Sequence, residues 1–200
     1  MKQDKRYIKT EKLIRTEFLS LLKNNLYDDI TIEKLCENAV ISKNTFYAHY
    51  KNKNDLLEKL EDEHIDKMIS FFKQNHSSVA TNGLDALEKD IDHTYDYLRN
   101  NIEEFEIFFK NNHIVNFSAK FETKMRSYTL TWSQMLVGTN ISEAKDVIMF
   151  DFIASGLAAT MKDYIMFRKI ISHEEYKSIV KQICLSPMKS FTDSIYKIHK

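Results

Sequence analysis

Glycine and proline are scarce in this chain of 200 residues, which contains three Gly and one Pro. An all-β fold needs many tight turns, and such turns depend on Gly, Pro, Asn and Asp at defined positions. The scarcity of the first two therefore excludes most β-rich architectures and favours helices joined by short connections. The length suffices for one large domain or two small domains with an apolar core.

Cysteine is rare as well, since the chain contains only Cys36 and Cys184. Both occupy apolar positions of expected helices, so we expect two buried free thiols in a reducing compartment rather than a disulfide. Residues 1–6 lack the apolar segment of a secretory signal. The longest apolar run, 152–161, is far shorter than the roughly 18 residues of a membrane span. We therefore expect a cytoplasmic protein with no membrane partner.

Motifs of the common enzyme classes are also missing. The chain has no Gly-rich phosphate loop, no recognisable nucleophile elbow, and no pair of His at metal-ligand spacing on one helix face. The carboxylates of Asp92, Asp96, Glu103 and Glu104 are typical of solvated helix faces. We expect no catalytic residue, no metal and no cofactor, and hence a binding protein rather than an enzyme.

Charge is balanced over the whole chain but not along it. The 29 Lys and Arg equal the 29 Asp and Glu, yet residues 1–53 hold eleven basic and seven acidic side chains. Residues 54–200 hold eighteen and twenty-two. A basic N-terminal part joined to an acidic remainder is typical of a DNA-binding domain on a regulatory body. An offset of this size also arises by chance.

Two short amphipathic helices follow each other between Thr31 and Tyr50. Apolar residues recur at i, i+3, i+4 and i+7 from Ile32, directly after Thr31, a favourable N-cap. Ser42 caps a second helix of about eight residues, in which Phe46 and Tyr50 face inward. The outer arc of this second helix carries Lys43, Asn44, Thr45, Tyr47 and His49. This pattern predicts a helix-turn-helix, which places its second helix in the major groove of DNA.

The segment from Thr45 to Leu57, Thr-Phe-Tyr-Ala-His-Tyr-Lys-Asn-Lys-Asn-Asp-Leu-Leu, resembles the signature of the TetR/AcrR family of bacterial regulators. The likeness extends from about Thr10 to Leu60, and the rest of the chain shows only a helical pattern. The family often has Gly in the turn where this chain has Val40. A β-branched residue tolerates positive φ poorly, so we expect a turn that is built differently or mildly strained.

The resemblance implies an all-α fold of nine to ten helices. A three-helix helix-turn-helix domain would occupy residues 1–51, and a helical regulatory and dimerisation domain residues 52–200. DNA contacts are expected from Thr31, Ser42, Lys43, Asn44, Thr45, Tyr47, His49, Lys51 and Lys53. By chemistry, Lys43, Asn44 and the Thr45 methyl suit base edges, whereas hydroxyl, imidazole and ammonium groups suit phosphates. The alternatives are a solvated polar face and, for His49, a structural histidine.

Further helical patterns surround this motif. The first helix is expected to start between Tyr7 and Glu11, which would leave Lys2, Lys5 and Arg6 as an N-terminal arm. The core of the three-helix domain is expected at Phe18, Leu22, Leu35 and Phe46.

Asn52 is expected to cap a helix of about two dozen residues that links the two domains. The polar residues 75–82 predict a loop, and Ser186 followed by Pro187 predicts the start of a last helix.

Aromatic and methionine side chains are concentrated in the central part of the chain. The resemblance implies that some of them line a pocket for a small apolar or aromatic effector, and the alternative is an ordinary core. The expected pocket residues are Met68, Tyr95, Phe105, Phe109, Phe121, Met125, Tyr128 and Trp132.

A run of small residues, 154–159, allows another helix to approach closely, which predicts a homodimer; the alternative is packing within one chain. The expected interface residues are Ile153, Gly156, Leu157, Met161 and Tyr164.

Together these observations predict a sequence-specific DNA-binding transcriptional regulator. As a homodimer it would bind a palindromic operator in double-stranded DNA, and a small-molecule effector would release it as a repressor. The alternative is an activator or co-regulator whose C-terminal domain binds a protein. An apolar cavity would favour the effector, whereas a filled domain with an exposed apolar patch would favour the protein partner.

Overall fold

The computed structural model describes residues 5–74, 76–110, 117–137, 144–167 and 171–198, and within these ranges it contains helices and no strands. The predicted all-α fold is therefore confirmed. The α-helices are α1 (Lys5–Asn24), α2 (Ile32–Asn38), α3 (Lys43–His49), α4 (Lys53–Gln74), α5 (His76–Asn100), α6 (Ile102–Lys110), α7 (Phe117–Val137), α8 (Ala144–Phe167) and α9 (His173–Ile198). One short 3₁₀ helix, η1 (Tyr27–Asp29), follows α1.

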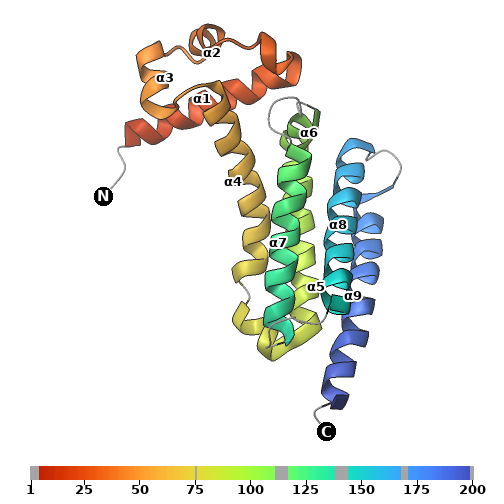
Figure 1. The fold of residues 1–200 in the computed structure, drawn as a ribbon. Helices are drawn as coiled ribbons and strands as arrows, with labels where there is room; N and C mark the ends of the chain where they lie inside the picture. Colours follow the sequence, from red (N-terminus) through yellow and green to blue (C-terminus); the bar gives the residue numbers. More distant parts are fainter. Residues whose placement is uncertain (1–4, 75, 111–116, 138–143, 168–170, 199–200) are drawn as a thin grey trace.

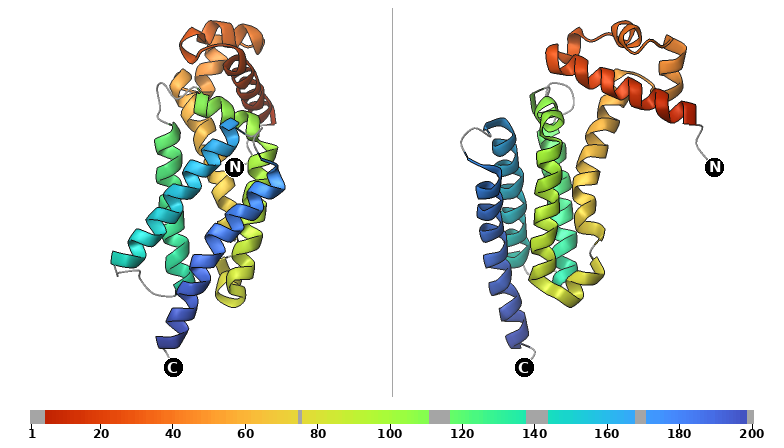
Figure 2. Two further views of the ribbon diagram at one scale, coloured as in Figure 1. Left: turned by 90° about the vertical axis from the view of Figure 1, so that its right-hand side faces the viewer. Right: turned by 180° about the vertical axis from the view of Figure 1, so that it is seen from behind.

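The helices form two parts that α4 connects (Figure 1). We call residues 5–50, which contain α1–α3, the head, and α5–α9 the body. The head lies across one end of the body, and the long helices of the body run side by side away from it (Figure 2). Helix α4 leaves the head and packs on α5 and α7, while α1 contacts the short helix α6.

The core of the head is the one that the sequence predicts. Phe18, Leu22, Leu35 and Phe46 are all buried, and the ring of Tyr50 is buried with them. The core continues without a break into α4 and the body. A three-helix head of this size is marginal alone, so packing on α4 stabilises it.

Three predicted boundaries are wrong. Helix α1 begins at Lys5, so Lys5 and Arg6 are helical rather than part of an extended arm; Lys2 lies outside the described residues. Residues 76–82 belong to α5, and α9 continues through Pro187 instead of ending before it. A proline inside a helix costs roughly 3 kcal/mol, and local propensity is a weak prior that tertiary packing overrides.

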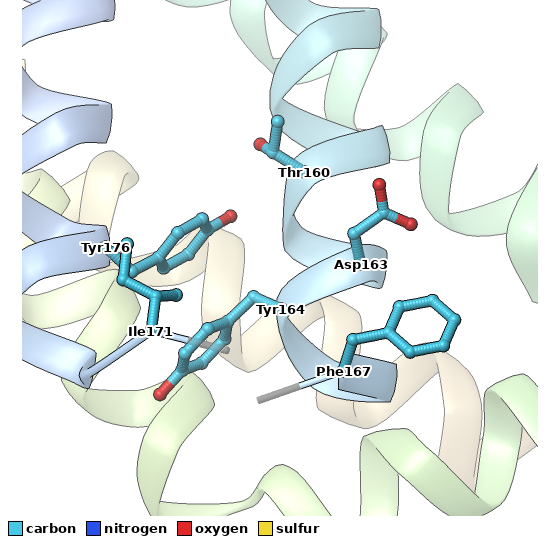
Figure 3. Close-up of a pocket in the computed structure, with 6 residues that line it drawn as sticks. All are labelled: Thr160, Asp163, Tyr164, Phe167, Ile171 and Tyr176. Atoms are coloured by element: carbon cyan, nitrogen blue, oxygen red, sulfur yellow. The ribbon is translucent and has the colours of Figure 1, made fainter. Parts of the chain in front are cut away.

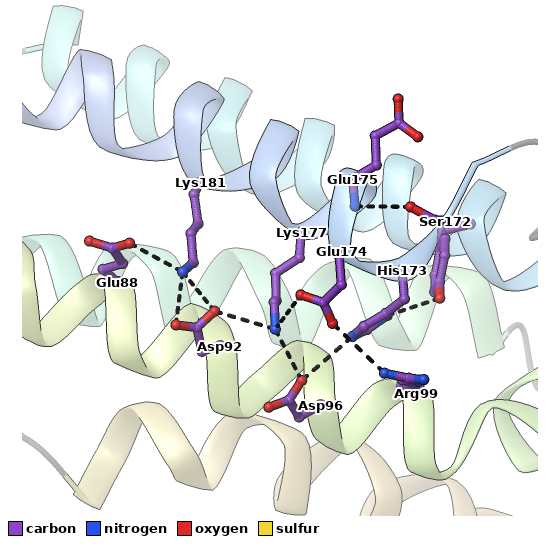
Figure 4. Close-up of polar contacts among 11 residues, drawn as sticks. Glu88, Asp92, Asp96, Arg99, Ser172, His173, Glu174, Glu175, Lys177 and Lys181 are labelled. Carbon is purple, nitrogen blue, oxygen red and sulfur yellow. Dashed lines mark hydrogen bonds and ion pairs between the residues drawn. The ribbon is translucent and has the colours of Figure 1, made fainter.

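Ion pairs join α9 to α5 and contribute to the packing of these two helices (Figure 4). The ammonium of Lys181 lies 2.7 Å from the Asp92 carboxylate and 3.1 Å from that of Glu88. The Lys177 ammonium lies 3.3 Å from Asp96. The side chains of Lys177 and Lys181 are mostly buried, the Asp92 carboxylate is partly buried beside them, and Asp96 stays exposed to solvent while it pairs with Lys177. A network of this kind is worth more than separate surface pairs.

Both cysteines are buried and free, as the sequence predicts. Burial raises the pKa of the Cys184 thiol to about 12, so this group stays protonated and unreactive near neutral pH. Among the described residues, no helix is both long and apolar enough to cross a membrane.

Candidate nucleic-acid interface

Helices α2 and α3 form the predicted helix-turn-helix, and side-chain caps define where each helix begins. The Oγ1 of Thr31 accepts a hydrogen bond from the backbone N–H of Lys34 at 3.1 Å. The Oγ of Ser42 accepts one from the N–H of Thr45 at 3.1 Å. Both predicted N-caps are confirmed, and each satisfies one of the donors that a helix N-terminus leaves unpaired.

The turn between the two helices has the hydrogen bonds of a Schellman motif. The N–H of Ile41 donates to the carbonyl of Cys36 at 3.0 Å, and the N–H of Val40 donates to that of Glu37 at 3.1 Å. Val40 therefore occupies the position that Gly usually takes, with φ at 52°. The sequence left open a turn that is built differently or one that is mildly strained, and the structure shows the strained turn.

The polar arc of α3 faces solvent as predicted. Lys43 and Asn44 are exposed, Thr45 and His49 are half-buried, and Tyr47 is 54% exposed. The Tyr47 ring packs edge-on against the buried ring of Phe46, with centroids 5.5 Å apart. This contact fixes the direction in which the Tyr47 hydroxyl leaves the head.

An acidic side chain of α2 lies against this surface. The carboxylate of Glu33 forms an ion pair with the ammonium of Lys43, and both groups are exposed. The hydrogen bond between them raises the pKa of Lys43 and lowers the pKa of Glu33. A phosphate or a base that binds Lys43 must therefore compete with Glu33.

The side chain of Lys53 has partners inside the chain. Its Nζ donates to the backbone carbonyls of Tyr27 at 2.6 Å and Ile30 at 2.7 Å, and lies 4.0 Å from the centroid of the Tyr27 ring. Burial lowers the pKa of Lys53. These contacts attach η1 to the start of α4. Lys53 is thus held in place by the head, whereas the expected neighbours Thr31 and Lys51 are exposed.

Hydrogen bonds from backbone to side chain define the start of α4. The N–H of Asp55 donates to Oδ1 of Asn52 at 2.9 Å, which confirms the predicted cap. The Asp55 carboxylate in turn accepts from the N–H of Lys51 at 2.9 Å and pairs with the ammonium of Lys59 at 3.0 Å. The backbone hydrogen bond from Lys51, together with Lys59, holds the pKa of Asp55 below its ordinary value.

Arg15 of α1 joins the end of α3 to α4, a contact that the sequence pattern did not predict. Its Nε donates to the Tyr50 hydroxyl at 3.0 Å, and its guanidinium also pairs with Glu11 at 3.0 Å and with Glu63 of α4. The next residue of α4, His64, lies against the rings of Phe105 and Phe108 in α6. The head is therefore tied through α4 to the body.

The side chains assigned to a ligand pocket lie in the core. Those that the structure describes are all buried: Met68, Tyr95, Phe105, Phe109, Phe121, Met125 and Tyr128. The side chain of Trp132 lies outside the described residues. The ring centroids of Phe105 and Phe109 are 6.3 and 5.6 Å from that of Phe121, so these rings pack on one another. This packing is that of a core, and the assignment to a pocket stays a prediction.

A hollow of about 360 Å³ lies elsewhere, between the end of α8 and the start of α9 (Figure 3). It is lined by Thr160, Asp163, Tyr164, Phe167, Ile171 and Tyr176. The rings of Tyr164 and Tyr176 are stacked, with centroids 4.4 Å apart, and the Tyr164 hydroxyl contacts Nδ1 of His173 at 2.9 Å. The volume lies in the range of small-molecule sites.

The expected dimer stripe on α8 requires revision. Ile153, Met161 and Tyr164 are buried within their own chain and Leu157 is half-buried, so of the five expected residues only Gly156 is exposed. Helix α8 is apolar on nearly all sides, and its sequence does not reveal which side packs on α7.

The exposed apolar side chains of α8 occupy a different side of the helix. Ile148, Phe152 and Gly156 recur every four residues, and α9 adds Ile179 and Ile183. We call these five residues the apolar face. Phe152 is 79% exposed and Ile183 is 56% exposed. A Cβ added at Gly156 would meet no atom within 4 Å in the single chain.

The described residues contain no group of three or more His, Cys, Asp or Glu arranged to hold a metal ion. The chemistry available on the outer face of α3 is instead that of hydrogen bonding and charge. Hydroxyl, amide, imidazole and ammonium groups stand on a short helix that a packed head holds out to solvent. Groups of these kinds can form hydrogen bonds with base edges and phosphates.

The fold is that of a TetR-type regulator. One solved structure, a TetR transcriptional regulator from Streptococcus agalactiae, matches with a TM-score of 0.59 and 22% identity over 88% of this chain and 96% of the other. Another, the dihydroxyacetone kinase operon activator DhaS, matches with a TM-score of 0.63 and 18% identity over 91% and 97%. No family model matches the sequence, and no curated protein matches it either.

Proposed function

We propose that the chain is a sequence-specific DNA-binding transcriptional regulator that acts as a homodimer. The observation that carries the proposal is the outer face of α3, which combines exposed Lys43, Asn44 and Tyr47 with an anchor, Phe46, that is fully buried. The TetR-type fold supports it. Residues 1–51 would be the DNA-binding domain and residues 52–200 the regulatory domain.

Within this proposal the side chains divide by role. Lys43, Asn44 and Thr45 lie at the start of α3 and would read base edges. The exposed Tyr47 hydroxyl and the half-buried His49 would bind phosphates of the DNA backbone. Thr31, Ser42 and Lys51 lie at or next to helix N-termini, where backbone N–H groups favour an anion.

The apolar face supports a homodimer. Monomeric proteins rarely expose large contiguous apolar patches, and this chain exposes Phe152 on α8 and Ile183 on α9, two helices that contact each other. A two-fold axis through this face would pair α8 and α9 with their copies in a four-helix interface. Two heads would then face DNA together, and a dimer whose recognition helices lie about one helical turn apart reads a palindrome.

The body is proposed to receive the signal. An apolar or aromatic small molecule would favour one of two head spacings, and it would act only through its different affinity for the two states. The hollow beside Tyr164 is a described site of suitable size. We propose repression that the effector releases. An activator is the second candidate, because the apolar face would also suit a protein partner.

Binding of the purified protein to random DNA duplexes over a salt series tests the proposal. A palindrome should be enriched, and Tyr47→Ala should bind it at least tenfold more weakly. Leu26→Ala is the matched control, because Leu26 is an exposed apolar residue of the head outside the α3 face. Weak binding that ignores sequence and disappears at modest salt would reflect phosphate attraction alone and would contradict the proposal.

A further inference from the structure

The imidazole of His49, the last residue of α3, lies against an aromatic ring from the start of α1. The ring centroids of Tyr7 and His49 are 3.9 Å apart with an angle of 26° between the planes. The ring of Tyr50, the residue that follows α3, lies 6.3 Å away at 30°. Tyr7 is partly exposed, so this stack forms at the edge of the head. It brings together residues 42 positions apart in the sequence.

One of the two imidazole nitrogens is buried. Nδ1 of His49 is buried and has no hydrogen-bond partner within the described part of the chain, although the His49 side chain as a whole is only half-buried. A buried N–H without an acceptor is costly, and orphaned buried N–H groups are rare. A neutral ring with its proton on Nε2 leaves only a lone pair at the buried position. A protonated ring would bury an unpaired N–H.

The charged groups around His49 do not reverse the preference for a neutral imidazole with its proton on Nε2. The nearest acidic group is the Glu11 carboxylate of α1, which favours the protonated ring, but Glu11 already accepts hydrogen bonds from Arg15 and the Tyr50 hydroxyl. Burial of the imidazole outweighs Glu11, and the pKa of His49 lies below its ordinary value.

We propose that Tyr7 is a positioning residue of the DNA interface, which holds His49 neutral with Nε2–H as its only donor to a DNA phosphate. This inference rests on the proposed function. A neutral donor at a fixed position forms a hydrogen bond with one phosphate oxygen. Because it carries no charge, it releases no counterion from the DNA and does not steepen the salt dependence of binding. The contact then depends less on pH than a contact from a free histidine, which titrates between about pH 5.5 and 7.5.

Nuclear magnetic resonance of the DNA-free protein tests the stack directly. Ring ¹⁵N and ¹³C shifts of His49 report its tautomer and pKa. The wild type should show the Nε2–H tautomer with a pKa below the ordinary value of about 6.5. Tyr7→Ala should raise that pKa, while Tyr7→Phe, which keeps the ring, should not. Ile8→Ala is the matched control, since it shortens an exposed apolar side chain next to Tyr7 on α1. A proton on Nδ1, or a pKa that Tyr7→Ala leaves unchanged, overturns the proposal.

Operator binding provides the second readout. At pH 8, Tyr7→Ala should weaken binding to the selected duplex by about 3- to 10-fold, the range expected for loss of an aromatic contact. The loss of affinity caused by Tyr7→Ala should be smaller at pH 6, because His49 without the Tyr7 ring becomes charged there. A loss that is equal at both pH values overturns the proposal. If the wild type selects no operator, the proposed function fails, and the resonance experiment still decides whether Tyr7 controls His49.

Discussion

Val40 is the position where the structure makes its sharpest stability prediction. A non-glycine residue in the left-handed region costs roughly 1–2 kcal/mol. Its side chain is 88% exposed, so little apolar burial is lost when the side chain is removed. Glycine in turn loses about 0.5–1 kcal/mol more conformational entropy on folding than a residue with a Cβ. Val40→Gly should therefore raise the free energy of unfolding by about 0.5–1 kcal/mol.

Thermal and urea unfolding followed by circular dichroism would measure this change. For a chain of this size, 1 kcal/mol corresponds to about 2–4 °C in Tm, so we expect a rise of about 1–4 °C and a higher urea midpoint at constant m-value. Val40→Ala keeps the Cβ and the strain, and should change stability by less than about 0.5 kcal/mol. If Val40→Gly is no more stable than Val40→Ala, the assignment of strain to this turn is wrong.

Three further predictions follow from the ion pairs and the apolar face. Glu33→Gln should tighten operator binding several-fold at low salt, as measured by fluorescence anisotropy. The reason is that Lys43 loses its ion-pair partner and the surface proposed to face DNA loses a negative charge. An unchanged affinity would mean that Lys43 does not contact DNA. If the chain is the proposed homodimer, Phe152→Glu combined with Ile183→Glu should convert it to a monomer in analytical ultracentrifugation without lowering helix content. A dimer that persists in this variant would place the interface elsewhere. Asp55→Asn should lower the free energy of unfolding near pH 7. The folded-state pKa of Asp55 is depressed, so the ionised carboxylate stabilises the fold above the unfolded-state pKa, and this stabilisation disappears as the pH falls through the folded-state pKa. The free energies of unfolding of wild type and Asp55→Asn should therefore converge in acid. A difference that stays constant with pH would contradict the assignment of the stabilisation to the ionised Asp55.

The head could be predicted closely because its signals are local. Thr31, Ser42 and Asn52 are caps defined by the residues that follow them, and the periodic positions of Leu35 and Phe46 depend only on helix geometry. The position of Val40 in the turn could also be predicted, although not which of two turn structures it would adopt.

The parts that sequence reasoning missed depend on tertiary contacts. Helix α9 continues through Pro187, although local turn chemistry predicts a helix start there. Three of the expected interface residues of α8, Ile153, Met161 and Tyr164, are buried within the single chain. The sequence could not show this, because Phe152 and Ile153 are equally apolar neighbours. The stack of Tyr7 on His49 and the carbonyl partners of Lys53 join residues that lie far apart in the chain, so no spacing rule could have found them.

If α3 reads base sequence, Asn44→Ala should change which bases the protein prefers. The base preferences of wild type and variant would be compared by selection from the same pool of random duplexes. We predict that the variant loses preference at one position, repeated symmetrically in the two half-sites, and keeps the rest of the palindrome. Because amide pairing with adenine is worth about 1–3 kcal/mol of discrimination, the loss should be at least fivefold at that position. An unchanged preference profile for Asn44→Ala, together with unchanged profiles for Lys43→Ala and Thr45→Ala, would contradict the claim that this face reads DNA.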